Sequence, residues 1–122
     1  MNWLKRAFHK EPDDETDPML ARLEHRIGYV FSDRNLLRHS LAHRSYVGQQ
    51  ADARRLDSNE RLEFLGDAVL DLCVSHYLFN KHKNKKEGEL TKYKSIIVSG
   101  KYLVKLANQI DLGSYLLLSD SE

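Results

Sequence analysis

The chain has 122 residues, of which 41% are hydrophobic and 30% are charged, and its formal net charge at pH 7 is +1. These values fit one small soluble globular domain and exclude a disordered tail. No apolar run approaches the roughly 20 residues that cross a bilayer, so we expect no membrane-spanning segment. The single cysteine, Cys73, has apolar neighbours that predict a buried thiol in a reducing compartment, which favours a cytoplasmic location.

The charges are distributed unevenly along the chain. Residues 11–17 contain five acids and no base, whereas residues 81–105 contain eight lysines and only two acids, Glu87 and Glu89. A local basic stretch suits a polyanionic partner. The alternative is that these lysines only solvate exposed helix faces, and the charge pattern leaves both interpretations open.

The first 18 residues are expected to lie outside the domain. The opening MNWLKRAFHK is basic and amphipathic, and the segment EPDDETDP that follows contains both prolines of the chain. We therefore predict an N-terminal basic arm and an acidic linker over residues 1–18, and a single domain over residues 19–122.

Two helices are predicted at the start of this domain. Apolar residues at helical spacing indicate a first helix that stops at Gly28. Asp33 is a suitable N-cap for a second helix that extends to Leu41. The polar residues 48–57 predict a loop.

A cap at Ser58 or Asn59 then predicts a long helix that extends to about Asn80. At about 100° per residue, four acids of this helix fall within an arc of roughly 80°. They are Glu60, Glu63, Asp67 and Asp71. Apolar residues occupy most of the remaining circumference, which predicts a helix that is central in the fold.

The row of acids has the composition of a metal site. Glu63 and Asp67 are spaced i, i+4, about 6 Å along the helix axis, so their oxygens can converge on one point. Hard carboxylate oxygens suit Mg²⁺ or Mn²⁺, which retain water, bind phosphate oxygens and activate water for attack on phosphorus. The alternative is a solvated stripe of acids with Arg61 and distant lysines as partners, and the spacing alone does not decide.

Gly66 lies inside this strong helix, where it costs about 1 kcal/mol relative to alanine. Glycine is tolerated where another backbone or a bulky side chain approaches closely. Phe64 beside it is a candidate for contact with a partner subunit, and packing within its own chain is an equal alternative.

The remaining residues also predict helices. A lysine-rich turn over residues 81–88 leads to a helix from about Glu89, which is interrupted near Ser99–Gly100 and resumes as far as Ile110. The segment that follows starts with a glycine-containing stop. Because no stretch alternates as a half-buried strand does, the predicted fold class is all-α.

At the long helix that starts near Glu60, the sequence resembles the ribonuclease III family. The stretch Glu60–Leu70, ERLEFLGDAVL, is similar to the signature helix of that family almost letter for letter. Further matches occur in the family's order at residues 27–29 (IGY), 41–46 (LAHRSY), 87–91 (EGELT) and 112–116 (LGSYL). The resemblance covers about residues 20 to 118. A long contiguous match, together with four shorter matches in the family's order, is far more specific than a lone short motif.

The resemblance implies a helical endonuclease domain that forms a homodimer and cleaves double-stranded RNA with Mg²⁺, as in the processing of ribosomal RNA precursors. By position, Glu63 and Asp67 would be the catalytic metal ligands, and Glu60 and Glu87 would be acids of the cleft near the dimer interface. Phe64 would insert into a socket on the partner subunit. The glycine beside it, Gly66, would belong to the same interface.

Five lysines are candidates for contact with RNA phosphates, with solvation alone as the alternative. They are Lys83, Lys85, Lys86, Lys92 and Lys94. Recognition of duplex RNA would rest on its shape, phosphates and 2′-hydroxyl groups.

The family pattern continues into a later helix, D-x-x-E-A-L-I-G, whose acids complete the metal site, and Asp120 and Glu122 do not match it. We therefore expect an incomplete set of metal ligands in these 122 residues. Three interpretations remain open, namely a metal-dependent endoribonuclease, a catalytically inactive ribonuclease III-like dimer that binds RNA or a ribonucleoprotein, and a purely structural helical dimer.

Overall fold

The computed structural model describes residues 17–49 and 57–121. The described residues form helices and no β-strand. Among them Ala42 and Leu117 form an isolated parallel β-bridge. This confirms the all-α prediction. The described residues of Met1–Asn59 and Ser114–Glu122 form one compact unit, and Glu60–Gly113 forms a second. None of the described helices combines the length and the apolar character that crossing a membrane requires.

Helix α2, Pro18–Ile27, opens the first unit. The Asp17 carboxylate caps it by accepting a hydrogen bond from the Met19 N–H at 2.9 Å, and a proline fits its first turn, where no N–H is needed. The helix ends at Gly28, whose φ of 71° is a left-handed conformation that glycine adopts readily. The predicted stop is therefore confirmed, but the helix starts at Pro18 rather than after it. The predicted arm and the rest of the linker lie outside the described residues.

Helix α3 spans Arg34–Leu41, and the predicted cap is confirmed because the Asp33 carboxylate accepts a hydrogen bond from the Leu36 N–H at 3.1 Å. A short helix, α4, follows at Arg44–Gln49 and was not predicted. It overlaps the start of the predicted loop, of which residues 50–56 lie outside the described residues. The sequence RSYVGQ has no apolar periodicity, so its helical form had no signal beyond local hydrogen bonding.

Leucines of α2 and α3 form the core of the first unit. Leu20 and Leu23 of α2 and Leu37 and Leu41 of α3 are at most 5% exposed. The C-terminal segment adds to this core through its backbone, since the Leu117 N–H donates to the Leu41 carbonyl at 2.9 Å. Burial of each leucine contributes about 1.5–3 kcal/mol to the free energy of unfolding.

A buried carboxylate ties α2 to the start of α3. Glu24 is 3% exposed, and its two oxygens accept hydrogen bonds from Arg34 Nη2 at 2.8 Å and from the Phe31 N–H at 2.9 Å. The bond from the Arg34 guanidinium, followed by that from Phe31, holds the pKa of Glu24 below its ordinary value of 4.5. The ionised form of Glu24 is therefore the one that stabilises this unit.

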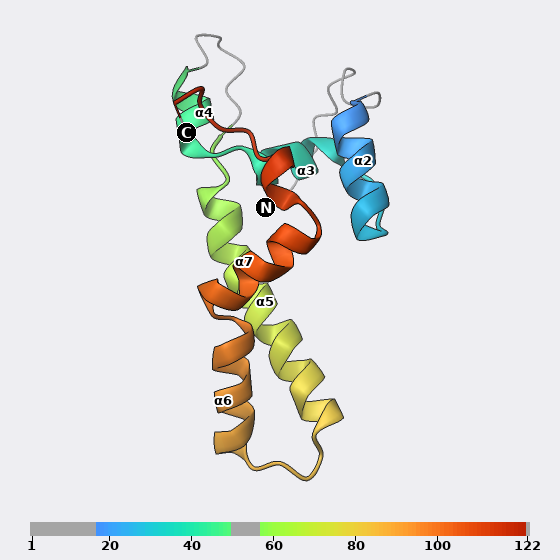
Figure 1. Ribbon diagram of the computed structural model, residues 1–122, viewed down its shortest axis with the longest axis vertical. Coiled ribbons are helices and arrows are strands. Elements are labelled where there is room, and N and C mark those ends of the chain that lie inside the picture. Colours follow the sequence, from blue (N-terminus) through green and yellow to red (C-terminus); the bar gives the residue numbers. More distant parts are fainter. Residues whose placement is uncertain (1–16, 50–56, 122) are drawn as a thin grey trace, which may run out of the picture. The chain divides into compact units, whose positions relative to one another are not determined.

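The second unit contains α5 (Glu60–Lys81), α6 (Glu87–Ile97) and α7 (Gly100–Gln109). Helices α5 and α6 lie side by side and antiparallel, joined by the lysine-rich turn, as Figure 1 shows in yellow-green and orange. The predicted interruption is confirmed at Ser99, whose Oγ accepts a hydrogen bond from the Tyr102 N–H and caps α7. A 3₁₀ turn follows at Leu112–Tyr115.

Two burial predictions for α5 are wrong. Leu78 is its only buried residue, and the apolar side chains of Leu65 and Leu72 are 60% and 69% exposed. Cys73 is also exposed, whereas its neighbours had predicted a buried thiol. An apolar pattern shows which side chains gain from burial but does not supply the neighbour that buries them, and within the described residues α6 covers only part of α5.

The lowered pKa of Glu24 predicts a pH-dependent stability. Because the folded state prefers ionised Glu24, its contribution is fully present above about pH 4.5 and is lost as the pH falls through the lower folded pKa. We expect Glu24→Gln to melt at a lower temperature than the wild-type chain at pH 7, and the difference to shrink below pH 4.5. Melting temperatures measured by circular dichroism from pH 7 to pH 3 test this. Asp120→Asn, which removes an exposed carboxylate of the same unit, is the control and should show no such convergence.

Candidate active site on α5 and α6

The predicted metal pair, Glu63 and Asp67, lies on the first two turns of α5. The helix is continuous from Glu60 to Lys81, so the i, i+4 spacing places both carboxylates on one face. Both residues are exposed, and neither forms an ion pair with another residue in the described part of the chain. Two hard oxygen donors facing water fit a cation such as Mg²⁺, which takes few protein ligands and keeps several waters.

The two acids do not form a complete cage by themselves. Across residues 17–49 and 57–121 the side chains of His, Cys, Asp and Glu form no cluster of three or more that could hold a metal ion. Glu60 lies in the first turn of α5, where the positive end of the helix dipole favours a carboxylate. The described chain therefore presents two exposed carboxylates on one face of α5, one helical turn apart, without a third acid, histidine or cysteine beside them.

The fourth acid of the row differs from the others. Oδ2 of Asp71 lies 3.8 Å from Nζ of Lys94 on α6, so its charge is balanced by a neighbouring helix. This contact belongs to the alternative that the sequence left open, in which distant lysines pair with the acids. The structure shows a lysine partner for Asp71, whereas Glu63 and Asp67 are solvated without an ion pair among the described residues, so both interpretations of these two acids stay open.

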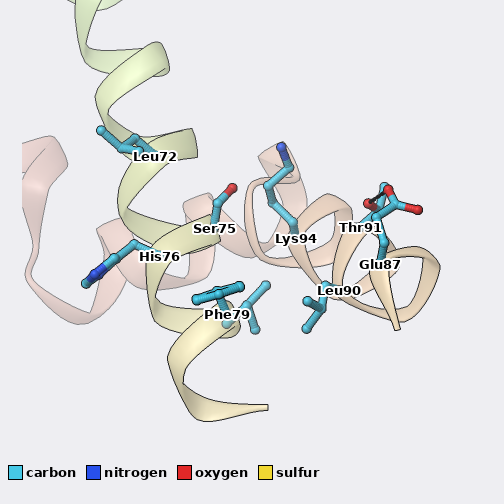
Figure 2. A pocket seen from close by; sticks show the side chains of 9 residues that line it. Leu72, Ser75, His76, Phe79, Glu87, Leu90, Thr91 and Lys94 are labelled. Atoms are coloured by element: carbon cyan, nitrogen blue, oxygen red, sulfur yellow. Dashed lines mark hydrogen bonds between the residues drawn. The ribbon is translucent and has the colours of Figure 1, made fainter. Parts of the chain in front are cut away.

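Glu87 lines a groove between α5 and α6. This groove has a volume of about 400 Å³, and Figure 2 shows the side chains that line it. They are Leu72, Ser75, His76, Leu78, Phe79, Glu87, Leu90, Thr91 and Lys94. The Thr91 hydroxyl donates a hydrogen bond to Glu87 Oε1 at 2.8 Å and orients this carboxylate.

Within one chain, Glu87 and the metal pair occupy different parts of the unit. The groove begins on α5 at Leu72, which is about 13 Å along the helix axis from Glu63 at 1.5 Å per residue. The sequence had grouped Glu60 and Glu87 as acids of one cleft, and the structure of the single chain does not bring them together with Glu63.

The five candidate lysines have different surroundings. Lys85 donates a hydrogen bond to Glu89 Oε1 at 2.8 Å, which raises the pKa of Lys85 and lowers that of Glu89. Lys94 is paired with Asp71, as described above. The other three, Lys83, Lys86 and Lys92, are exposed. Two of the five lysines are therefore already engaged by acids.

The start of α6 is fixed by a residue that the sequence had not singled out. Oε2 of Glu89 accepts a hydrogen bond from the backbone N–H of Lys86 at 3.3 Å, which satisfies a donor at the helix N-terminus. A glutamate at the third helical position is a known capping signal, so this role was readable from the sequence.

Phe64 and Gly66 both face open space in the described chain. Phe64 is 84% exposed, so it does not pack against the described part of this chain. A Cβ atom added at Gly66 would meet no described atom within 4 Å. This stretch of α5 is therefore accessible to another molecule.

The sequence matches a known family. A family model described as Ribonuclease-III-like matches residues 33–122. Ribonuclease 3 of Fusobacterium nucleatum is 48% identical over 103 residues, which are 84% of this chain and 44% of that protein. Ribonuclease 3 of Clostridium beijerinckii is also 48% identical, over 84% of this chain and 43% of that protein. The chain thus spans less than half the length of these relatives.

Solved structures agree with the fold. The chain superimposes on two structures of the nuclease domain of ribonuclease III from Campylobacter jejuni, both 44% identical to it, with TM-scores of 0.73 and 0.71. The matches cover 84% of this chain and 67% and 65% of the two nuclease-domain chains. The first of these structures was described for flexibility in a region involved in dimer formation.

Proposed function

The chain belongs to the ribonuclease III family, and we propose that the protein is an endoribonuclease that cleaves double-stranded RNA with bound Mg²⁺. The observation that carries this proposal is the pair of exposed carboxylates, Glu63 and Asp67, on a helix whose sequence matches that family. Mn²⁺ shares the preference for oxygen ligands and is the expected substitute. A cytoplasmic location is part of the proposal and is supported by Cys73 being the only cysteine of the chain.

In this mechanism Glu63 and Asp67 would hold the ion at the face of α5. When bound, Mg²⁺ supplies activation of water and neutralisation of charge on the phosphate. Glu60, one turn before, would add negative charge beside the pair. The reaction adds water across a phosphodiester bond, and leaves a 5′-phosphate on one product and a 3′-hydroxyl on the other.

Exposed lysines of the second unit are proposed to hold the RNA backbone. Lys83 lies in the turn between α5 and α6, and Lys92 lies on α6. Ammonium groups that are free to meet phosphates contribute affinity without reading sequence, which suits a duplex whose deep groove is closed to side chains. Lys85 and Lys94 contribute less because acids already engage them.

The active form is proposed to be a homodimer. Phe64 is a large ring left exposed on α5, and Gly66 leaves room beside it for a side chain of a second copy. A symmetric dimer would use this patch twice, which makes each apolar contact count twice. The dimer would also bring a second set of acids to the cleft, including Glu87 of the partner.

Substitution of the metal ligands tests the catalytic proposal. Loss of a residue that only orients a metal ligand lowers metal affinity or activity by about 10- to 100-fold. Because Asp67 and Glu63 are the proposed ligands themselves, we expect Asp67→Ala and Glu63→Gln to reduce the rate of cleavage by at least about 100-fold. Labelled duplex RNA, incubated with the protein with and without Mg²⁺, gives the rates. Asp120→Asn removes the same charge from an exposed position outside the metal pair and is the control. Binding of RNA without cleavage by the wild-type protein would favour the inactive RNA-binding module instead.

Truncation of Phe64 tests the dimer. Burial of a phenylalanine side chain contributes about 1.5–3 kcal/mol, so Phe64→Ala should weaken self-association by at least about tenfold. Sedimentation equilibrium measures the dissociation constant. Phe79→Ala removes another exposed ring, near the far end of the same helix, and is the control. An equal loss in both variants would contradict a specific role for Phe64.

Salt dependence of RNA binding tests the lysines. We expect Lys83→Met and Lys92→Met each to lower the slope of log affinity against log salt by about one, the value for one lost phosphate contact. Lys85→Met should change the slope less, because Glu89 already neutralises that lysine. Fluorescence anisotropy of a labelled duplex in chelator, across a series of salt concentrations, provides the measurement. If the slope of log affinity against log salt is the same in all three variants as in the wild-type protein, these lysines act only as solvated charge.

A further inference from the structure

The acids of α5 offer two overlapping positions for a divalent ion. Glu63 and Asp67 are spaced i, i+4, and so are Asp67 and Asp71. Both pairs place two carboxylates about 6 Å apart along one helix face. Spacing and donor chemistry are therefore equal for the two pairs, and another feature must select between them.

The structure distinguishes the two pairs through α6. Nζ of Lys94 lies 3.8 Å from Oδ2 of Asp71, and the lysine side chain is only 33% exposed. Lys94 is one of the residues that line the groove between α5 and α6, as Figure 2 shows. Glu63 and Asp67, in contrast, have no ion pair among the described residues.

The position of Lys94 follows from how α6 begins. Glu89 accepts the Lys86 N–H and fixes the first turn of α6. Lys94 lies seven residues after Glu87, which is about two helical turns, so the two residues share the face that lines the groove. The antiparallel arrangement of α5 and α6 then brings Lys94 to the middle of α5, where Asp71 lies.

An ammonium group at this place has two effects on a cation. It balances the charge of Asp71, and it repels a doubly charged ion that approaches the same carboxylate. At about 4 Å in water, this repulsion weakens binding of a divalent ion by roughly 30-fold, and by less where salt screens it.

We infer that Lys94 sets the register of the metal site on α5, that is, which pair of acids binds the divalent ion. Its pairing with Asp71 leaves Glu63 and Asp67 as the pair that is open to the ion. This inference rests on the proposed function, and it assigns Lys94 a role different from contact with RNA. Lys94 acts through Asp71 and is thus a positioning residue. Neutralising it should open the second pair, Asp67 and Asp71, to the ion.

The footprint of Mn²⁺ on the chain tests this directly and needs no catalysis. Mn²⁺ broadens the nuclear magnetic resonance signals of amides close to it, so a titration of the ¹⁵N-labelled 122-residue chain shows where the ion binds. In the wild-type chain we expect broadening centred on residues 63–67. In Lys94→Met we expect the centre of broadening to shift toward residues 67–71, with Mn²⁺ affinity near Asp71 raised between about fivefold and 30-fold.

Three further variants separate register from net charge and from folding. Lys92→Met removes the same charge from an exposed position of α6 and should retain the wild-type footprint. Lys94→Arg keeps the charge and should also retain it. The double variant Lys94→Met with Asp71→Asn removes the second pair and should restore broadening to residues 63–67, which shows that the protein is intact without Lys94.

The outcomes distinguish this inference from the proposed function. If wild-type broadening is centred on residues 63–67 and Lys94→Met does not change it, Lys94 does not set the register, while the metal site stands. If the wild-type chain already shows the ion at Asp71, the inference is overturned as well. If no amide of α5 broadens in any variant, the proposed metal site itself fails and the inference fails with it.

Discussion

Two like charges stand one helical turn apart on α5 of the second unit. Glu63 and Asp67 face water on α5 with no ion pair among the described residues, so their mutual repulsion opposes the helix that holds them. Water screens this repulsion because both side chains are exposed, and a divalent ion would remove it. The same arrangement that slightly destabilises the helix would suit a cation under the proposed function, since no ion pair of these two acids within the described residues would have to break.

Helix α6 gives one of the four acids of α5 surroundings that differ from those of the metal pair. Its start is fixed by Glu89, which binds both the Lys86 N–H and the Lys85 ammonium. Its middle is fixed against α5 by the buried Leu78 and by the pair between Asp71 and Lys94. Surface ion pairs contribute at most about 1 kcal/mol to stability, so under the inference made above Lys94 would affect where a cation binds more than it affects folding.

The ends of most helices were predictable because they depend on neighbouring residues. Gly28 and Asp33 act through their own backbone or side chain within a few residues, and Ser99 caps α7 in the same way. Helix α4 was missed because it has no apolar periodicity. The burial of α5 and of Cys73 was predicted wrongly, since an apolar helix pattern does not specify which element covers it.

The sequence by itself determined the helical class, the family resemblance and the row of four acids on one helix face, because each of these depends on residues close together in the chain. Only the tertiary structure decided which acids of the row remain available, because Asp71 and Lys94 are 23 positions apart and meet only through the packing of α5 on α6. It also decided that Phe64 faces outward. A local pattern fixes the face on which a side chain lies, and the partner that it meets there depends on elements that are distant in sequence.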